Sequence, residues 1–257
     1  MSGKVYLVGA GPGDPELLTV KALRVLQSAD VVLHDALVSD GVLALVSPQA
    51  EVIHIGKRAG KKLLTQEEIN AVLVHYAQTA QTVVRLKGGD PLIFGRAGEE
   101  MDALREAGVD FEVVPGISAS MAAAAAAGVS LTDRRHASQV MFITAHREPG
   151  KKSFEWPVIP PHTTLAVYMP GSDYGDVGES LITAGFEAST PCVIVASASQ
   201  PSQQIRWSEL RRLVDEETLP APALMIVGKV ARSAETLRDA GVWSEIERYG
   251  ERVGKVF

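Results

Sequence analysis

The sequence alternates short apolar runs with segments whose apolar residues recur at helical spacing, and this alternation constrains the fold more than any other feature. In the first half of the chain, runs typical of strands begin at Lys4, Val31, Glu51, Thr82 and Phe111, and the first of them, ended by a glycine, is typical of a buried strand. Between two of these runs, Thr65-Gln66-Glu67-Glu68 is a capping box, which predicts the start of a helix with a buried apolar face. Asp14 and Pro15 predict the start of an earlier helix. A β-α repeat of this kind predicts a mostly parallel sheet covered by helices.

A second series of strand-like runs follows Pro115-Gly116, and its members begin at Gln139, Thr164, Pro191 and Ala223. Helical stretches are predicted between some of them, around residues 177–184 and 208–217. We therefore expect two α/β domains with mostly parallel sheets, comprising residues 1–114 and 115–257. Because paired domains of this kind usually bind a small ligand between them, we expect the ligand site in the interdomain cleft.

Composition excludes several classes of protein. The chain has 257 residues, of which 46% are hydrophobic and 22% are charged, as in ordinary globular proteins. The net charge of −6 argues against nucleic-acid and anionic-membrane partners. No apolar run reaches roughly 18 residues and no cleavable apolar segment precedes the strand at Lys4, so we expect neither a membrane span nor a signal peptide. The single cysteine, Cys192, excludes a disulfide framework and favours a cytoplasmic protein.

A glycine-rich turn, Gly9-Ala10-Gly11-Pro12-Gly13-Asp14, directly follows the first predicted strand. It is similar to the dinucleotide-binding fingerprint, in which a third glycine lets helix and strand pack closely. Here that glycine comes one residue early and Asp14 stands in its place, where a carboxylate would compete with a pyrophosphate for the helix amides. The turn argues against an ordinary dinucleotide site, although a nicotinamide-dependent oxidoreductase stays an alternative.

Two further polar segments follow predicted strands. Gly56-Lys57-Arg58-Ala59-Gly60-Lys61-Lys62 is not a phosphate loop, because no Ser or Thr follows the lysine, but its position favours capture of an acidic substrate. In Lys87-Gly88-Gly89-Asp90, the paired glycines let the backbone approach a ligand closely, and the carboxylate suits ribose hydroxyls. Arg96 then offers a fork-shaped donor for a carboxylate.

Taken in order, these motifs resemble those of the tetrapyrrole methylases. The matching segments are residues 8–15, 34–39, 56–60, 66–70, 85–96, 113–119 and 167–169, and the resemblance runs from Lys4 to Ala231. It implies two α/β domains, with S-adenosyl-L-methionine bound in the cleft between them and S-adenosyl-L-homocysteine as product. It also implies a homodimer.

The resemblance implies roles for individual residues. Asp35 and Lys57 match the positions proposed as proton acceptor and proton donor. Arg96, Glu99 and Arg134 would face the substrate. The positions that line the cofactor site are matched by Pro12, Gly88, Gly89, Asp90, Ile93, Ser118, Ala119, Met169, Ala198 and Ala223. No metal is expected, because His136, His146 and His162 lack carboxylates at metal-binding spacing.

The implied reaction is C-methylation of uroporphyrinogen III at C2 and C7 to give precorrin-2, which feeds sirohaem, cobalamin or haem d1 synthesis. A sulfonium methyl needs in-line positioning against a carbon nucleophile, and a carboxylate or a lysine can move the proton that is displaced. An acidic protein needs a local cationic site for a polycarboxylate substrate. The candidates are Lys57, Arg58, Lys61, Arg96, Arg134 and Arg135.

Two departures from the family pattern affect the expected substrate site. The arginine usual after the aspartate is Ala36 here, and Asp133 stands where a histidine is usual. Both changes subtract positive charge where propionates are expected. A methylase of a later corrin-pathway tetrapyrrole and a non-catalytic cofactor-binding relative therefore stay open as alternatives.

Overall fold

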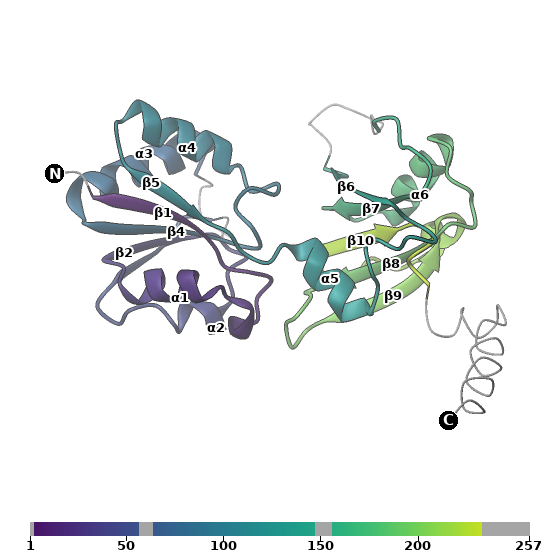
Figure 1. Ribbon diagram of the computed structural model, residues 1–257, viewed down its shortest axis with the longest axis horizontal. Coiled ribbons are helices and arrows are strands. Elements are labelled where there is room, and N and C mark those ends of the chain that lie inside the picture. Colours follow the sequence, from purple (N-terminus) through teal and green to yellow (C-terminus); the bar gives the residue numbers. More distant parts are fainter. Residues whose placement is uncertain (1–2, 57–63, 147–155, 233–257) are drawn as a thin grey trace, which may run out of the picture. The chain divides into compact units, whose positions relative to one another are not determined.

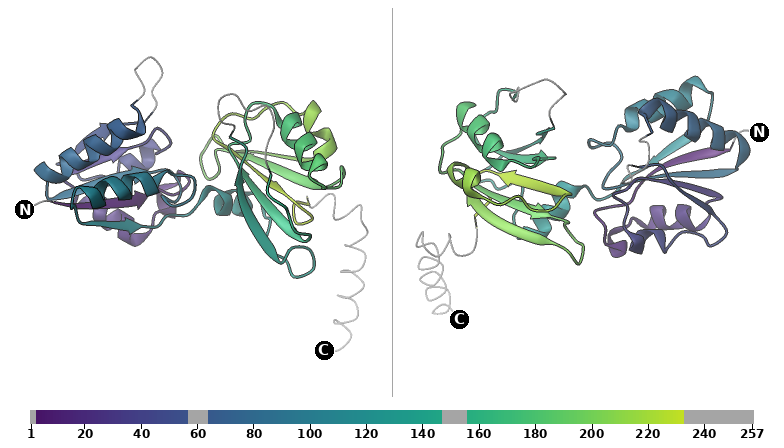
Figure 2. Two further views of the ribbon diagram at one scale, coloured as in Figure 1. Left: turned by 90° about the horizontal axis from the view of Figure 1, so that it is seen from above. Right: turned by 180° about the vertical axis from the view of Figure 1, so that it is seen from behind.

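The computed structural model describes residues 3–56, 64–146 and 156–232 (Figures 1 and 2). The described residues form two compact units, one containing residues up to 122 together with Ser197–Gln203, the other containing 123–196 and 204–232. The domain boundary predicted between residues 114 and 115 stays a prediction. In this division, residues 115–122 and Ser197–Gln203 group with the first sheet.

The first unit is built on a parallel sheet with the strand order β3-β2-β4-β1-β5. Helices cover both faces of this sheet, with α1 and α2 on one face and α3 and α4 on the other (Figure 1). The parallel sheet covered by helices that the β-α repeat predicts is confirmed for this unit. Its elements are β1 (Lys4–Gly9), η1 (Pro15–Leu17), α1 (Val20–Gln27), β2 (Val31–His34), α2 (Asp40–Leu43), β3 (Glu51–His54), α3 (Gln66–Thr79), β4 (Thr82–Lys87), α4 (Ala97–Glu106), β5 (Phe111–Val114) and the start of α5 (Ala119–Ala127).

Two cores form because successive residues of a strand point to opposite faces of the sheet. On β1, Val8 packs into the core beneath α1 and α2, whereas Leu7 packs into the core beneath α3 and α4. Both side chains are fully buried. The continuous apolar run of β1 is therefore a strand that is buried on both faces.

Of the two helix starts predicted from the sequence, one is present in the structure and the other is not. The Thr65 hydroxyl accepts a hydrogen bond from the Glu68 amide, and the Glu68 carboxylate accepts one from the Thr65 amide, so the predicted capping box is present. Asp14 caps only a single 3₁₀ turn, η1. The prediction that the helix begins there was wrong, because Leu18 is extended and α1 begins after a second cap, the Thr19 hydroxyl.

The second unit contains a sheet with the strand order β6-β7-β10-β8-β9, in which only β6 and β7 are parallel. The expectation of a mostly parallel sheet was therefore right for the first unit and wrong for the second. Tyr174 on α6 and Leu210 and Leu213 on η2 pack into the core of this unit. Its elements are β6 (Gln139–Thr144), β7 (Thr163–Tyr168), α6 (Tyr174–Thr183), β8 (Pro191–Ala196), β9 (Gln204–Glu209), η2 (Leu210–Asp215) and β10 (Ala223–Val227).

The helix predicted around residues 208–217 is absent. Gln204–Glu209 forms β9 and pairs with β8, and Leu210–Asp215 forms the 3₁₀ helix η2. Leu210 and Leu213 are both buried, and their three-residue spacing suits a 3₁₀ turn as well as an α-helix. In the part of the chain that the structure describes, no helix is long and apolar enough to cross a membrane.

Candidate active site

Several of the predicted site residues lie where strands of the first sheet end. Asp35 follows β2, Gly88 follows β4, and the turn containing Pro12 follows β1. These three strands are neighbours in the order β2-β4-β1, and all run parallel. Their carboxyl ends therefore meet at one edge of the sheet, which is where open α/β sheets bind their ligands.

Three buried charged side chains, those of Arg85, Lys87 and Glu100, form a network that includes Asp35. Arg85 donates from Nη2 to Asp35 Oδ1 at 2.5 Å and from Nε to Glu100 Oε1 at 2.9 Å. Lys87 Nζ donates to the same Glu100 oxygen at 2.8 Å and lies 3.8 Å from Asp35 Oδ2. The side chain of Asp35 is 28% exposed, whereas those of Arg85, Lys87 and Glu100 are buried. Asp35 is thus the exposed end of a buried network of two cations and two carboxylates.

Burial changes the pKa of Lys87. Removal from water lowers the pKa of its ammonium, and the neighbouring charge of Arg85 lowers it further. The carboxylates of Glu100 and Asp35 oppose this effect. The ammonium therefore depends on its carboxylate partners for its charge, as expected of a buried cation.

Glycines bring three turns together at this edge. Gly11 and Gly89 exchange backbone hydrogen bonds of 3.2 and 2.7 Å, and both have a φ of +68°. A Cβ placed on Gly116 would lie 2.4 Å from the Gly89 carbonyl oxygen, and one on Gly9 would lie 2.6 Å from the Gly116 nitrogen. No side chain fits at these positions, so the turns after β1, β4 and β5 approach each other backbone to backbone.

Asp90 ties two of these turns together. Its Oδ1 accepts from the Leu92 amide at 2.8 Å, and its Oδ2 accepts from the Gly116 amide at 3.0 Å. A carboxylate oxygen can accept more than one hydrogen bond, so these contacts leave capacity for ligand hydroxyls. The predicted contact with ribose stays a prediction.

The remaining residues predicted for the cofactor site fall in both units. Gln200 donates from Nε2 to the Pro12 carbonyl at 3.1 Å, so the segment carrying Ala198 lies against the first glycine-rich turn. The hydroxyls of Ser118 and Ser120 are buried and 2.8 Å apart. The first unit therefore contains Pro12, Gly88, Gly89, Asp90, Ile93, Ser118, Ala119 and Ala198, while Met169 and Ala223 belong to the second unit.

In the second unit, Met169 and Ala223 stand at adjacent strand ends. Met169 follows β7 and Ala223 begins β10, and these two strands pair through Tyr168 and Leu224. Met169 has a φ of 51° and is exposed. A non-glycine residue in the left-handed region is uncommon and often marks a functional turn.

The predicted substrate residues are exposed. Arg96 donates from Nε and Nη2 to the two carboxylate oxygens of Glu99, each at 2.7 Å. This pairing is the main cause that raises the pKa of Arg96 and lowers that of Glu99. Arg134 lies in the other unit, and its neighbour Arg135 binds the Asp133 carboxylate. That contact holds the pKa of Asp133 well below its usual range.

The family of this chain follows from its similarity to known proteins. The family described as tetrapyrrole (corrin/porphyrin) methylases matches residues 4–214. This chain belongs to the tetrapyrrole methylases. That membership agrees with the resemblance carried by the sequence motifs.

Individual relatives support the same assignment. The chain is 46% identical over 247 residues to the siroheme synthase of Azotobacter vinelandii, covering 95% of this chain and 52% of that protein. It is 46% identical over 234 residues to the S-adenosyl-L-methionine-dependent uroporphyrinogen III methyltransferase, chloroplastic, of Arabidopsis thaliana, covering 89% of this chain and 63% of that protein. The chain thus spans about half the length of the siroheme synthases it matches.

A solved structure confirms the fold class. The uroporphyrin-III C-methyltransferase from Thermus thermophilus, complexed with S-adenosyl homocysteine, superposes with a TM-score of 0.76 at 38% identity. The match covers 90% of this chain and 94% of that one. The mixed α/β architecture predicted from the sequence is therefore that of a tetrapyrrole methylase.

Part of the predicted site lies outside the described residues. Lys57, the expected proton donor of this tetrapyrrole methylase, is among them, as are Arg58 and Lys61. Ala36, which replaces the usual arginine, directly follows Asp35 and is exposed. The roles of these residues stay predictions.

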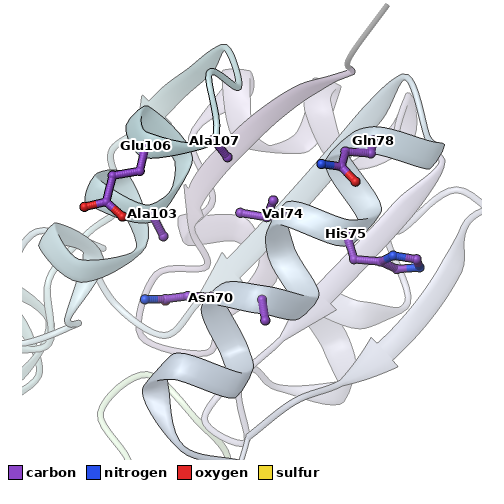
Figure 3. A pocket seen from close by; sticks show the side chains of 8 residues that line it. Asn70, Val74, His75, Gln78, Ala103, Glu106 and Ala107 are labelled. Carbon is purple, nitrogen blue, oxygen red and sulfur yellow. The ribbon is translucent and has the colours of Figure 1, made fainter.

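A shallow hollow of about 430 Å³ lies between the outer surfaces of α3 and α4 (Figure 3). None of the predicted site residues contributes to it. Its lining consists of Asn70, Ala71, Val74, His75, Gln78, Ala103, Glu106 and Ala107. The candidate site is therefore defined by the converging turns and the buried charges of the first unit, and this hollow is separate from those residues.

The sequence pointed to Asp35 but missed Glu100. Glu99 and Glu100 are adjacent in the first turn of α4, yet Glu99 is exposed and Glu100 is fully buried. Helical spacing carried the signal, because Glu100 shares a face with Ala97 and Leu104, which are also buried. A second signal lay in β4, where Arg85 and Lys87 interrupt an otherwise apolar run. Buried cations need carboxylate partners.

Proposed function

We propose that this chain is an enzyme that transfers methyl groups from S-adenosyl-L-methionine to C2 and C7 of uroporphyrinogen III. The products are precorrin-2 and S-adenosyl-L-homocysteine. One observation carries the proposal: the Asp35 carboxylate, held by Arg85, stands beside glycine-rich turns at the carboxyl edge of the parallel sheet. Names of relatives that act on uroporphyrinogen III support the choice of substrate.

The residues at this edge fit S-adenosyl-L-methionine. A Cβ on Gly88 would come within 3.0 Å of the Leu37 Cβ, so this turn presents bare backbone. The turn of Pro12, the Gly88–Gly89–Asp90 turn and Ser118 would hold the cofactor. When bound, the cofactor supplies an electrophilic methyl group on sulfonium sulfur.

The geometry suits Asp35 as the proton acceptor. Arg85 occupies Oδ1. Among the described residues, the ion-pair partner of Oδ2 is Lys87, whose Nζ lies at 3.8 Å, beyond hydrogen-bonding distance. Oδ2 can therefore take the proton that leaves the methylated macrocycle, and Lys57 would return a proton.

Arg96 and Arg134 suit the carboxylates of the substrate. The contacts of Arg96 with Glu99 use Nε and Nη2, and a guanidinium has five N–H donors. Donors on Nη1 stay available for a propionate, and Glu99 holds the side chain in place. Arg134 is exposed, and Asp133 binds Arg135 instead of this residue.

An anaerobic assay tests the proposal. The purified chain is incubated with S-adenosyl-L-methionine and enzymatically generated uroporphyrinogen III, and the methyl groups added are counted by mass. Two additions are expected. No addition, with binding of S-adenosyl-L-homocysteine intact by calorimetry, would favour a later corrin-pathway substrate or a non-catalytic relative. Stabilisation by NAD(P)H but not by S-adenosyl-L-homocysteine would favour an oxidoreductase.

We also propose that the chain acts in the cytoplasm as a homodimer. The family resemblance supports the dimer, and the single cysteine, which is buried, suits a reducing compartment. Light scattering coupled to size-exclusion chromatography tests the dimer, with twice the monomer mass expected. Fractionation of the source cells tests the location.

A further inference from the structure

Glu100 has an unusual environment for a carboxylate. It has no exposed surface, and its Oε1 accepts hydrogen bonds from both Arg85 Nε, at 2.9 Å, and Lys87 Nζ, at 2.8 Å. In the described part of the chain, Oε2 has no hydrogen-bond partner. Burying a carboxylate with one oxygen unsatisfied is costly, so the arrangement calls for an explanation.

The strand explains why both cations reach the same oxygen. Arg85 and Lys87 are two residues apart on β4, so their side chains lie on one face of the sheet, the face that α4 covers. Glu100 projects from the buried side of α4 onto that pair. One carboxylate therefore binds both cations, and of the two only Arg85 also donates a hydrogen bond to Asp35.

Restraint of Lys87 matters for Asp35. Lys87 Nζ lies 2.8 Å from Glu100 Oε1 but 3.8 Å from Asp35 Oδ2. A lysine side chain is flexible, and without Glu100 its ammonium could close this gap and bind Oδ2. A carboxylate bound by Arg85 on one oxygen and by Lys87 on the other is a weaker base for a substrate proton, because a cation on each oxygen stabilises the charged form.

We propose that Glu100 is a positioning residue for proton transfer: it holds Lys87 away from Asp35 and so keeps Oδ2 open to the substrate. This inference rests on the proposed function. It adds Glu100 and Lys87, neither of which touches the reacting atoms, to the groups that set up the reaction.

The charges around Asp35 let the effect be measured. His34 is the last residue of β2 and directly precedes Asp35. Its Nδ1 lies 3.1 Å from the Asp35 carbonyl oxygen, and its ring contacts that of His54 on β3. Burial lowers the pKa of His34, which keeps this ring neutral near pH 7. Arg85 and Lys87 on β4 and Glu100 on α4 are then the charged groups facing Asp35 among the described residues.

The first variant is Glu100→Gln, which keeps the shape and removes the charge. Its amide oxygen still accepts from Arg85, but its hold on Lys87 is weaker, and Lys87 moves to Oδ2. We expect kcat to fall on the order of tenfold to a hundredfold. The KM for S-adenosyl-L-methionine should stay within about twofold, because no predicted cofactor contact changes. The acidic limb of the pH profile should move to lower pH, because the approaching cation stabilises the Asp35 carboxylate.

Asp102→Asn is the matched control. It makes the same carboxylate-to-amide change on the same helix and breaks an ion pair, but Asp102 and its partner Arg105 are exposed. Its kcat and pH profile should equal those of the wild type. A Glu100→Gln variant with the same kcat and pH profile as this control would overturn the proposal.

The double variant Lys87→Met/Glu100→Gln separates positioning from structural support. It removes the ammonium that Glu100 restrains and leaves the Arg85–Asp35 pair in charge balance. If Glu100 acts by restraining Lys87, the double variant should regain most of the lost kcat. A double variant that folds but is inactive would refute the mechanism. Because its kcat is compared with that of the wild type, this test also works if Glu100→Gln alone does not fold.

A measurement without substrate distinguishes failure of this inference from failure of the proposed function. The side-chain carboxyl carbon of Asp35, assigned with Asp35→Asn, is followed by NMR as pH is varied. In Glu100→Gln it should titrate at lower pH than in the wild type. If Glu100→Gln shows this shift but the wild-type protein methylates no substrate, only the proposed function is rejected. An unchanged titration rejects the role of Glu100.

Discussion

Arg85 Nη2 donates a hydrogen bond of 2.5 Å to Asp35 Oδ1, and this contact joins the interior of β4 to the residue that follows β2. The arginine is buried and the aspartate is partly exposed. A rigid central strand therefore fixes the orientation of a carboxylate that stands at the ligand-binding edge of the sheet. Such support from the scaffold is what a proton-transfer group requires.

The first prediction is that Asp35→Asn abolishes methyl transfer without loss of cofactor binding. The amide keeps the shape of the side chain but cannot take up a proton. We expect kcat to fall at least about a hundredfold, as for the loss of a general base. Methyl transfer is measured by mass, and affinity for S-adenosyl-L-homocysteine by calorimetry. Asp110→Asn is the control, since Asp110 is exposed and precedes β5 at the opposite edge of the sheet; equal losses in both variants would contradict the role of Asp35.

The second prediction concerns the close approach of the three turns. Gly116→Ala places a Cβ 2.4 Å from the Gly89 carbonyl oxygen, so the backbone must shift. We expect a loss of about 1–3 kcal/mol in the free energy of unfolding, measured with urea, together with weaker binding of S-adenosyl-L-homocysteine. Gly98→Ala is the control, because a Cβ there meets nothing within 4 Å. That variant should be neutral or up to about 1 kcal/mol more stable, since alanine favours helix.

The strands that position the site could be predicted from sequence, but the partners of the charged residues could not. A buried parallel strand is recognisable from its apolar run, so the places of Asp35 and Gly88 followed directly. Glu100 pairs with Arg85 across 15 positions of sequence, and only the packing of α4 onto β4 brings them together. The helical spacing of Glu100 with Leu104 marked its burial, but this spacing alone does not identify a partner.

The antiparallel pairings of the second sheet were not predictable from strand patterns. Apolar runs such as Pro191–Ala196 look the same in a parallel and an antiparallel strand when both faces are buried. The spacing of Leu210 and Leu213 concealed the preceding strand β9, in which Ile205 and Trp207 alternate with polar residues. Pairing direction depends on the connections between strands, which the residues of one strand do not encode.

The third prediction concerns the pH dependence of stability. Burial lowers the pKa of His34 below its unfolded value, so protonation favours the unfolded chain. The stabilising effect of the neutral ring is fully present above the unfolded pKa and is lost as pH falls from about 7 toward 5. In His34→Gln, the free energy of unfolding should decrease less over this range. The exposed His75 provides the control, and His75→Gln should keep the wild-type slope; a His34→Gln variant with that same slope would contradict the prediction.

The last prediction concerns Asp133, which lies next to Arg134, the residue predicted to face the substrate. Asp133 accepts hydrogen bonds from the backbone amide and the guanidinium of Arg135, which neutralises that cation. Asp133→Asn should release Arg135 to bind a substrate carboxylate. We expect the KM for uroporphyrinogen III to fall a few-fold, with kcat unchanged and a steeper dependence of KM on salt, because screening weakens exposed charge contacts. Asp102→Asn releases Arg105 in the same way on the first unit and should leave KM unchanged. An unchanged KM in Asp133→Asn would mean that Arg135 does not reach the substrate, and Arg134 would then be the cation of this turn that binds it.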